Sequence, residues 1–165
     1  MPLYKRIIFI GKTDTIMAPM AAAIMKTSPV ADYMEIESRG IVSLFPEPMN
    51  EKAKAVLASN GIRTEHVSVP LTKADFGEDH LLLAMTKQEY SDIVDRFSDD
   101  ENLFSLPSFV LSSEEIPDPY GGPMSAYAAC FDSIYDFLEE LTRILLEREE
   151  DIGGTASEEP QRSEV

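Results

Sequence analysis

The residues with the clearest chemical potential form a polar loop, Gly11 to Ala18, between an apolar run and a predicted helix. The apolar run, Ile7 to Ile10, has the composition of a buried strand. Pro19 fits the first helical position, where its missing N–H costs nothing. A strand, a loop and a helix in this order direct backbone N–H groups and the positive end of the helix dipole at one point. The sequence therefore predicts a pocket with anion-binding geometry.

The sequence context of the other reactive side chains predicts structural roles for them. Cys130 is the only thiol and falls in an apolar stripe, where a free cysteine is usually a small core residue. His66 and His80 lie on separate segments without metal-ligand spacing, so we predict neither a metal site nor a cofactor. Thr13 and Thr15 carry loop hydroxyls, but no histidine is close in sequence to activate them. We expect these two threonines to support the helix entry.

The elements that must position this loop alternate between strands and helices. Strands are expected at Ile7–Ile10, Met34–Ser38 (with a turn at Gly40), His80–Met85 and within Leu103–Val110, whereas Val67–Val69 fits a short strand or an extended connection. Helices are expected from Pro19, between Asn50 and Asn60-Gly61, over Lys87–Phe97, and from Pro123 to about Arg148. This alternation predicts an α/β fold with a parallel sheet covered on both faces and right-handed crossovers.

The composition indicates one acidic domain. The chain has 165 residues and a formal charge of −16, with a pI near 4.4. Such a charge opposes nucleic acid and anionic membranes as partners. A single cysteine cannot form an internal disulfide, and neither a signal peptide nor a membrane span is evident. These features predict a cytoplasmic protein.

The chain divides into a domain, residues 1–148, and an acidic tail, residues 149–165. The tail contains Gly, Ser and Pro and has almost nothing to bury, so we predict that it is disordered. Its expected role is to increase solubility, and docking of a partner is the alternative.

Several motifs occur in an order that resembles the low-molecular-weight protein tyrosine phosphatases. They are Pro19-Met20-Ala21, Ser38-Arg39-Gly40, Asp75-Phe76 followed by Leu81–Met85, and Pro117-Asp118-Pro119-Tyr120-Gly121-Gly122. The resemblance covers roughly residues 4 to 146. It implies a three-layer α/β/α fold with a central four-stranded parallel sheet, and phosphatase activity.

The departures from the family pattern remove its reactive groups. With the loop aligned on the Pro-Met-Ala motif, the family's nucleophilic cysteine falls on Gly11 and its phosphate-binding arginine on Met17. The neighbouring serine falls on Ala18, a second cysteine on Ile16, and a glycine–asparagine pair on Thr13-Asp14. Glycine cannot attack phosphorus, and a thioether cannot grip phosphate as a guanidinium does. The resemblance therefore implies that the family mechanism is lost.

Asp118 occupies the family's general-acid position. The alternative reading of Asp118 is turn chemistry, because an Asp-Pro-Tyr-Gly-Gly sequence is typical of a turn. Tyr120 is expected either at the edge of a ligand cleft or as a cover for the core. Lys12 supplies positive charge to the loop, whereas Asp14 raises the cost of binding phosphate. Thr15 falls where the resembling bacterial protein-arginine phosphatases carry threonine.

Three functions remain open. The first is an inactive family member that acts as a binding or regulatory module for a phosphorylated protein, a small anion or another protein partner. The second is an active phosphatase for phosphotyrosine or phosphoarginine that uses Asp118 or Asp14 in place of cysteine, a chemistry that generally needs Mg²⁺. The third is an interaction protein that uses its tail or the loop Leu44–Met49. We favour the first. The predicted ligand-binding residues are Gly11, Lys12, Thr13, Asp14, Thr15, Ile16, Met17 and Tyr120.

Overall fold

The structure, a computed structural model, describes the backbone of residues 4–158 and the side chains of residues 4–148. Its elements, in chain order, are β1 (Arg6–Gly11), α1 (Met17–Met25), η1 (Pro29–Asp32), β2 (Glu35–Gly40), α2 (Glu51–Ser59), η2 (Lys73–Asp75), β3 (His80–Ala84), α3 (Lys87–Arg96), β4 (Leu103–Ser105), α4 (Leu106–Phe109) and α5 (Met124–Glu158). No helix in this described part is long and apolar enough to cross a membrane.

The four strands form one parallel sheet in the order β2-β1-β3-β4. Strand β1 is central, with Gly11 opposite Gly40 of β2 and Ile10 opposite Ala84 of β3. Strand β4 lies at the edge and is only three residues long. The sheet therefore confirms the predicted four-stranded parallel arrangement.

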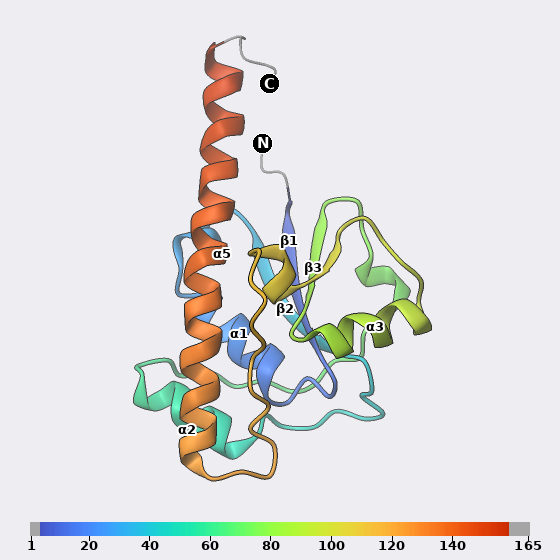
Figure 1. Cartoon of the computed structure of the whole chain (residues 1–165), viewed down its shortest axis with the longest axis vertical. Coiled ribbons are helices and arrows are strands. Elements are labelled where there is room, and N and C mark those ends of the chain that lie inside the picture. Colours follow the sequence, from blue (N-terminus) through green and yellow to red (C-terminus); the bar gives the residue numbers. More distant parts are fainter. Residues whose placement is uncertain (1–3, 159–165) are drawn as a thin grey trace.

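Helices cover both faces of the sheet. Successive side chains of β1 point to opposite sides, so each face of the sheet has its own core. Ile7 and Phe9 belong to a large core shared with α1, α2 and α5. Ile8 and Ile10 belong to a smaller core that includes Ile93 of α3. Figure 1 shows α1, α2 and α5 on one side of the sheet and α3 on the other. The three-layer α/β/α fold is thus confirmed.

Helix α1 begins two residues earlier than the sequence predicts. Its first residue is Met17, so Pro19 takes the third helical position rather than the first. Proline is tolerated there, because the N–H groups of the first turn have no intrahelical acceptor. All nine residues of α1 are buried. Met17 and Ala18 therefore belong to a buried helix and not to the preceding loop.

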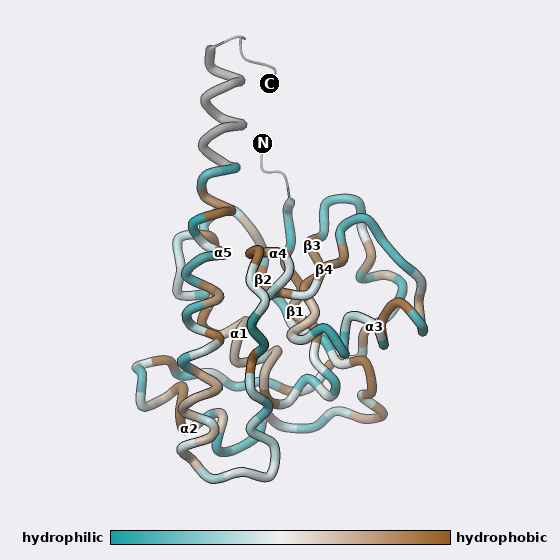
Figure 2. The backbone as a smooth tube through the Cα atoms, viewed as in Figure 1, coloured by the Kyte–Doolittle hydropathy of each residue, from teal (hydrophilic) through white to brown (hydrophobic). Residues whose placement is uncertain are grey.

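Helix α5 carries the predicted apolar stripe on one side, and Figure 2 shows its alternation of hydrophobic and hydrophilic residues. The stripe residues Tyr127, Cys130, Phe131, Ile134, Phe137, Leu138, Leu141 and Leu145 are all buried. The helix extends to Glu158, so the predicted tail is helical as far as that residue. The rest of the predicted tail, residues 159–165, lies outside the described residues.

Other boundaries also differ from the sequence-based expectations. Strand β2 runs through Gly40, where we expected a turn. The segment Leu103–Val110 is a short strand followed by α4, because the Ser105 hydroxyl caps the helix by accepting the Ser108 N–H. Val67–Val69 is an extended connection with one bridge, from Val67 to Pro48. In contrast, the predicted end of α2 is confirmed, since Gly61 has φ = +81°.

Candidate functional site

A cavity of about 550 Å³ lies at the edge of the sheet where the parallel strands end. It is lined by Gly11, Lys12, Thr13, Asp14, Thr15, Ile16, Met17, Ala18, Glu47, Asn50, Glu89, Asp118 and Tyr120. These residues follow β1, follow β2, begin α3 and precede α5. Carboxyl ends of parallel strands commonly meet in such a crevice. The structure therefore brings together all eight predicted ligand-binding residues and Asp118.

The loop after β1 is held through its carbonyl oxygens. The Gly11 oxygen accepts the Ile41 N–H at 3.0 Å, and the Lys12 oxygen accepts the Val42 N–H at 2.7 Å. The Thr15 oxygen accepts an N–H from the N-cap residue of α2 at 2.9 Å. Within the described part of the chain, the backbone N–H groups of residues 12–18 have no acceptor. Such a run of free donors at a helix start is the feature that forms anion-binding nests in other proteins.

The end of β2 packs directly under this loop. A Cβ on Gly40 would lie 2.8 Å from the Thr13 carbonyl carbon and 3.0 Å from the Asp14 nitrogen. Only glycine permits this approach without moving the backbone. Gly40 therefore sets the path of the loop from within a strand, rather than by forming the turn predicted from the sequence.

Asp14 anchors the loop from inside. It has φ = +62° and is 1% exposed. Its Oδ2 accepts the Val69 N–H at 2.9 Å and lies 2.8 Å from His66 Nε2. His66 Nε2 also lies 3.3 Å from the Ser38 hydroxyl. His66 thus has a structural contact, and sequence reasoning missed this contact because distant segments form it.

Glu89 is a carboxylate in the cavity that the sequence analysis did not identify. It lies in the first turn of α3, where its N–H donates to the Thr86 hydroxyl at 3.2 Å. Burial raises the pKa of Glu89, and the charge of Asp118 raises it further. The sequence did offer one indication of this site: Glu89 follows the buried run of β3, and β1 and β3 end at the same edge of the sheet.

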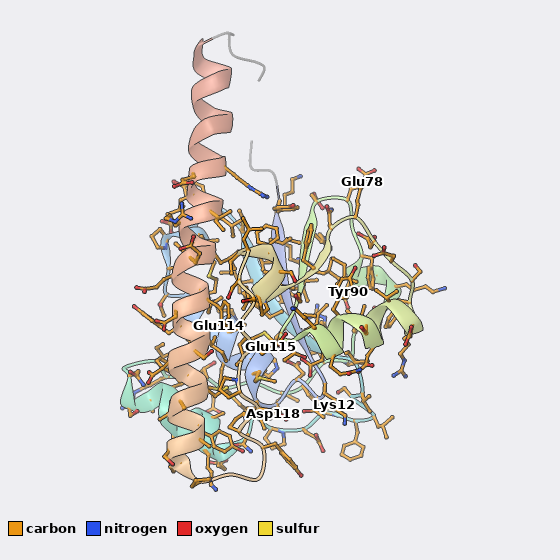
Figure 3. The ribbon with its side chains drawn as sticks, viewed as in Figure 1. Lys12, Glu78, Tyr90, Glu114, Glu115 and Asp118 are labelled. Carbon is orange, nitrogen blue, oxygen red and sulfur yellow. The ribbon has the colours of Figure 1, made fainter. Side chains whose placement is uncertain are left out.

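Asp118 forms the predicted turn and also lines the cavity. Its Oδ1 accepts the Tyr120 N–H at 3.0 Å, and the Gly122 N–H donates to the Pro119 oxygen at 2.8 Å. Tyr120 is 80% exposed, so it edges the cleft and does not cover the core. Figure 3 shows Asp118 and Lys12 at the same end of the molecule.

The remaining reactive candidates do not reach the cavity lining. Cys130 is fully buried in the core, and burial raises the pKa of its thiol to about 12. The thiol therefore stays protonated at neutral pH. His80 Nδ1 donates to the Asp75 backbone oxygen at 2.8 Å, because a carbonyl oxygen can only accept. Among the described residues, no group of three His, Cys, Asp or Glu side chains is placed to hold a metal ion.

The predicted interaction loop, Leu44–Met49, is divided between the surface and the interior. Leu44 and Phe45 are largely exposed, whereas Met49 is 2% exposed and belongs to the core. Glu47 lines the cavity. The loop therefore joins the cavity to an exposed apolar surface.

A parallel sheet with helices on both faces, and a cavity at its carboxyl edge where a loop enters a helix, defines a three-layer α/β protein. The model of the family described as "Low molecular weight phosphotyrosine protein phosphatase" matches residues 6–151. The chain belongs to this family.

Curated relatives and solved structures agree with this assignment. A protein-arginine-phosphatase from Geobacillus stearothermophilus is 32% identical over 85% of this chain and 95% of its own length. A low molecular weight protein-tyrosine-phosphatase, PtpB, from Staphylococcus haemolyticus is 25% identical over 82% of this chain and 96% of its own. The solved structure of the Geobacillus stearothermophilus arginine phosphatase has a TM-score of 0.80 and 29% identity, with coverage of 96% of this chain and 99% of that chain.

Proposed function

We propose that this protein is a catalytically inactive member of its family and acts as a binding or regulatory module. The observation that carries the proposal is the composition of the cavity loop. Gly11, at the family's nucleophile position, has no side chain, and Met17, at the arginine position, has only a thioether. Both lie in the cavity lining, so the missing groups are missing from the place where a phosphate would sit.

The other loop side chains do not replace the lost nucleophile. The hydroxyls of Thr13 and Thr15 bond to each other at 2.8 Å. The nearest histidine contact to the loop goes from His66 to the carboxylate of Asp14. A hydroxyl nucleophile needs an adjacent base, and neither threonine has one among its described hydrogen-bond partners.

The family supplies the classes of partner. Its members named above are phosphatases of proteins, so a phosphorylated protein is a natural partner for a member that binds without turnover. A small anion on the loop N–H groups and a protein docked on the cleft are the other two candidates. We expect this binding to take place in the cytoplasm.

A second candidate function is an active phosphatase for phosphotyrosine or phosphoarginine. The observation that favours it is the pair of carboxylates, Asp118 and Glu89, in one cavity. One would act as nucleophile or base with Mg²⁺ bound to the substrate. The two carboxylates would repel a phosphate dianion unless a cation intervened, which is why we prefer the inactive module.

The decisive experiment measures hydrolysis of para-nitrophenyl phosphate, a phosphotyrosine peptide and a phosphoarginine peptide, with and without Mg²⁺. The wild type should be inactive. A Gly11→Cys, Met17→Arg double variant should show turnover at least about a hundredfold above the wild type, because it restores the nucleophile and the phosphate clamp. A Cβ at residue 11 would lie 3.3 Å from the Ala18 Cβ, so only a small adjustment is required.

A Gly11→Ala, Met17→Arg variant is the matched control, since it adds the same Cβ without a thiol. It should remain inactive. Wild-type turnover that disappears in Asp118→Asn would overturn the proposal and support the second candidate.

A further inference from the structure

Two neighbouring segments, residues 42–48 and 67–70, expose hydrophobic side chains on one surface. Leu44 is 86% exposed and Phe45 is 61% exposed. Glu47 is the one charged residue in the two segments. Single exposed hydrophobic residues are ordinary, whereas a contiguous group of them marks an interaction site. The apolar surface defined in this way consists of Val42, Leu44, Phe45, Pro46, Pro48, Val67, Val69 and Pro70.

Ser68 holds the two segments of the apolar surface together. Its N–H donates to the Glu47 oxygen at 2.8 Å, and its hydroxyl accepts the Glu47 N–H at 2.9 Å. The same hydroxyl accepts a hydrogen bond from the Ser43 hydroxyl at 3.1 Å. Ser68 is 4% exposed, so the side chains on either side of it in this extended segment point outward. Because these contacts already order the backbone, docking on the surface costs little further ordering.

The two ends of the apolar surface carry charges of opposite sign. At one end, exposed Arg96 donates to the Ile41 oxygen at 3.2 Å, next to the start of the surface. At the other end, Glu65 lies two residues before Val67, and its side chain is 88% exposed. Glu65 lies 3.1 Å from Lys54, but an exposed pair of this kind is weak. The Glu65 carboxylate is therefore available to a partner.

A surface with an apolar middle and oppositely charged ends is complementary to a second copy of itself. In a two-fold contact, each end of one copy faces the opposite end of the other copy. The Arg96 guanidinium of each copy then faces the Glu65 carboxylate of the other. The net charge of −16 makes two copies repel each other, but exposed charges more than about 8 Å apart are largely screened at physiological salt.

We infer that the apolar surface binds a second copy of this protein, in a two-fold contact that buries Leu44 and Phe45 and pairs Arg96 of each copy with Glu65 of the other. The inference goes beyond the proposed function and does not rest on it. The apolar side chains supply the affinity of the contact, and the charged ends supply its orientation. Glu47 also lines the cavity, so the contact borders the cavity of each copy.

The test is sedimentation velocity of the full-length protein at about 0.15 M salt, over concentrations from about 5 to 500 μM, where weak contacts are measurable. We expect a reversible change from monomer to dimer as the concentration rises. Leu44→Glu should weaken the dimer at least about tenfold, because a two-fold contact contains the substitution twice. Its melting temperature should stay that of the wild type, since Leu44 is 86% exposed.

Leu111→Glu is the matched control for Leu44→Glu. Leu111 is 93% exposed and lies outside the apolar surface, so this variant adds the same charge elsewhere. It should dimerise as the wild type does.

A charge exchange tests the two-fold arrangement. Arg96→Glu should weaken the dimer by about fivefold, because it places two carboxylates opposite each other at both ends. Combining Arg96→Glu with Glu65→Arg restores each pair with its charges exchanged, and should recover the dimer. Combining Arg96→Glu with Glu78→Arg gives the same net charge without the pair and should not recover it. Figure 3 shows Glu78 far from Lys12, whose oxygen accepts the Val42 N–H at 2.7 Å.

Three results would overturn the inference. The first is a wild type that stays monomeric over the whole concentration range, which would leave a different protein as the occupant of the apolar surface. The second is a dimer that Leu44→Glu weakens no more than Leu111→Glu does. The third is a charge exchange with Glu65→Arg that recovers no more of the dimer than the combination with Glu78→Arg.

Discussion

Asp14 combines an unusual backbone conformation with a buried carboxylate at the centre of the cavity loop. Its φ of +62° lies in the left-handed region, which Asp and Asn tolerate better than other residues with a side chain. Its Oδ2 satisfies the Val69 N–H, which connects the loop to a segment far along the chain. This one side chain therefore determines both the shape of the loop and its attachment.

Replacing Asp14 should separate these effects. Asp14→Ala leaves the Val69 N–H unpaired and puts alanine in the left-handed region, so we expect it to lower the free energy of unfolding by about 2–4 kcal/mol. Asp14→Asn keeps an acceptor for the Val69 N–H, and asparagine tolerates the left-handed backbone conformation. This variant should change the free energy of unfolding by less than about 1 kcal/mol. Urea unfolding measures both. An alanine variant as stable as the asparagine variant would contradict this role.

Glu89 should make stability depend on pH in a recognisable direction. Burial raises its pKa above the ordinary value of 4.5, so the folded protein holds this proton more tightly than the unfolded chain. Its contribution to stability is present below pH 4.5 and is lost as pH rises through the higher folded-state pKa. Glu89→Gln should therefore be more stable than the wild type at pH 7, and this advantage should shrink as pH falls to about 4.

Thermal unfolding between pH 4 and 8 measures the difference between Glu89→Gln and the wild type. Glu78→Gln is the control for the loss of one negative charge, because Glu78 is exposed. A constant difference across this pH range would show that Glu89 does not titrate differently in the folded state.

At the scale of elements, the cavity depends on the contact between the end of β2 and the loop after β1. The two strands are in register up to Gly11 opposite Gly40, and the loop leaves at that point. The carbonyl groups of the loop accept N–H groups from the segment that follows β2, whereas the loop's own N–H groups have no acceptor within the described part of the chain. The path of the loop therefore depends on strand pairing and not on the loop sequence alone.

Gly40→Ala should disturb this contact. Its Cβ would come within 2.8 Å of loop backbone, so the loop must shift. We expect a loss of at least about 2 kcal/mol in unfolding free energy and changed backbone resonances for residues 12–16. Gly61→Ala is the comparison, because nothing lies within 4 Å of a Cβ at that position. Only the positive φ of residue 61 should destabilise this variant, by about 1–2 kcal/mol of unfolding free energy. Unchanged loop resonances in Gly40→Ala would contradict the close approach.

For the whole molecule, α5 extends the large core along its length. Its stripe packs against α1 and α2, and its contact with α4 includes Arg148, whose guanidinium lies 5.0 Å from the centre of the Phe109 ring. The predicted division of the chain at residue 148 falls just after this contact. The division itself remains a prediction.

A truncation series tests it. Ending the chain after Arg148 should change the melting temperature by no more than about 2 °C, because it keeps every buried apolar side chain of α5 that the structure describes, the last of which is Leu145. Ending it after Leu138 removes buried Leu141 and Leu145 and should lower unfolding free energy by several kcal/mol, since each large buried side chain contributes about 2–5 kcal/mol. A large loss in the first truncation would move the domain boundary into the acidic segment.

Much of the fold was predictable because local patterns determine it. The apolar runs at β1 and β3 have no polar face, as expected of strands covered on both sides. The spacing along α5 marks its buried stripe, and Asn50 caps α2 through its side chain. The strand within Leu103–Val110 was predicted, but its short length and the start of α1 were not, because tertiary packing decides where short elements begin and end.

The sequence by itself determined which chemical groups are absent from the loop. A glycine at position 11 and a methionine at position 17 carry neither a thiol nor a guanidinium in any conformation. Only the tertiary structure decided what surrounds that loop. Parallel pairing brings the ends of β1 and β3 to one edge, which places Glu89 in the cavity, and the turn before α5 adds Asp118. Side-chain chemistry is a property of each residue, whereas the sign of a cavity's charge depends on which distant residues share it.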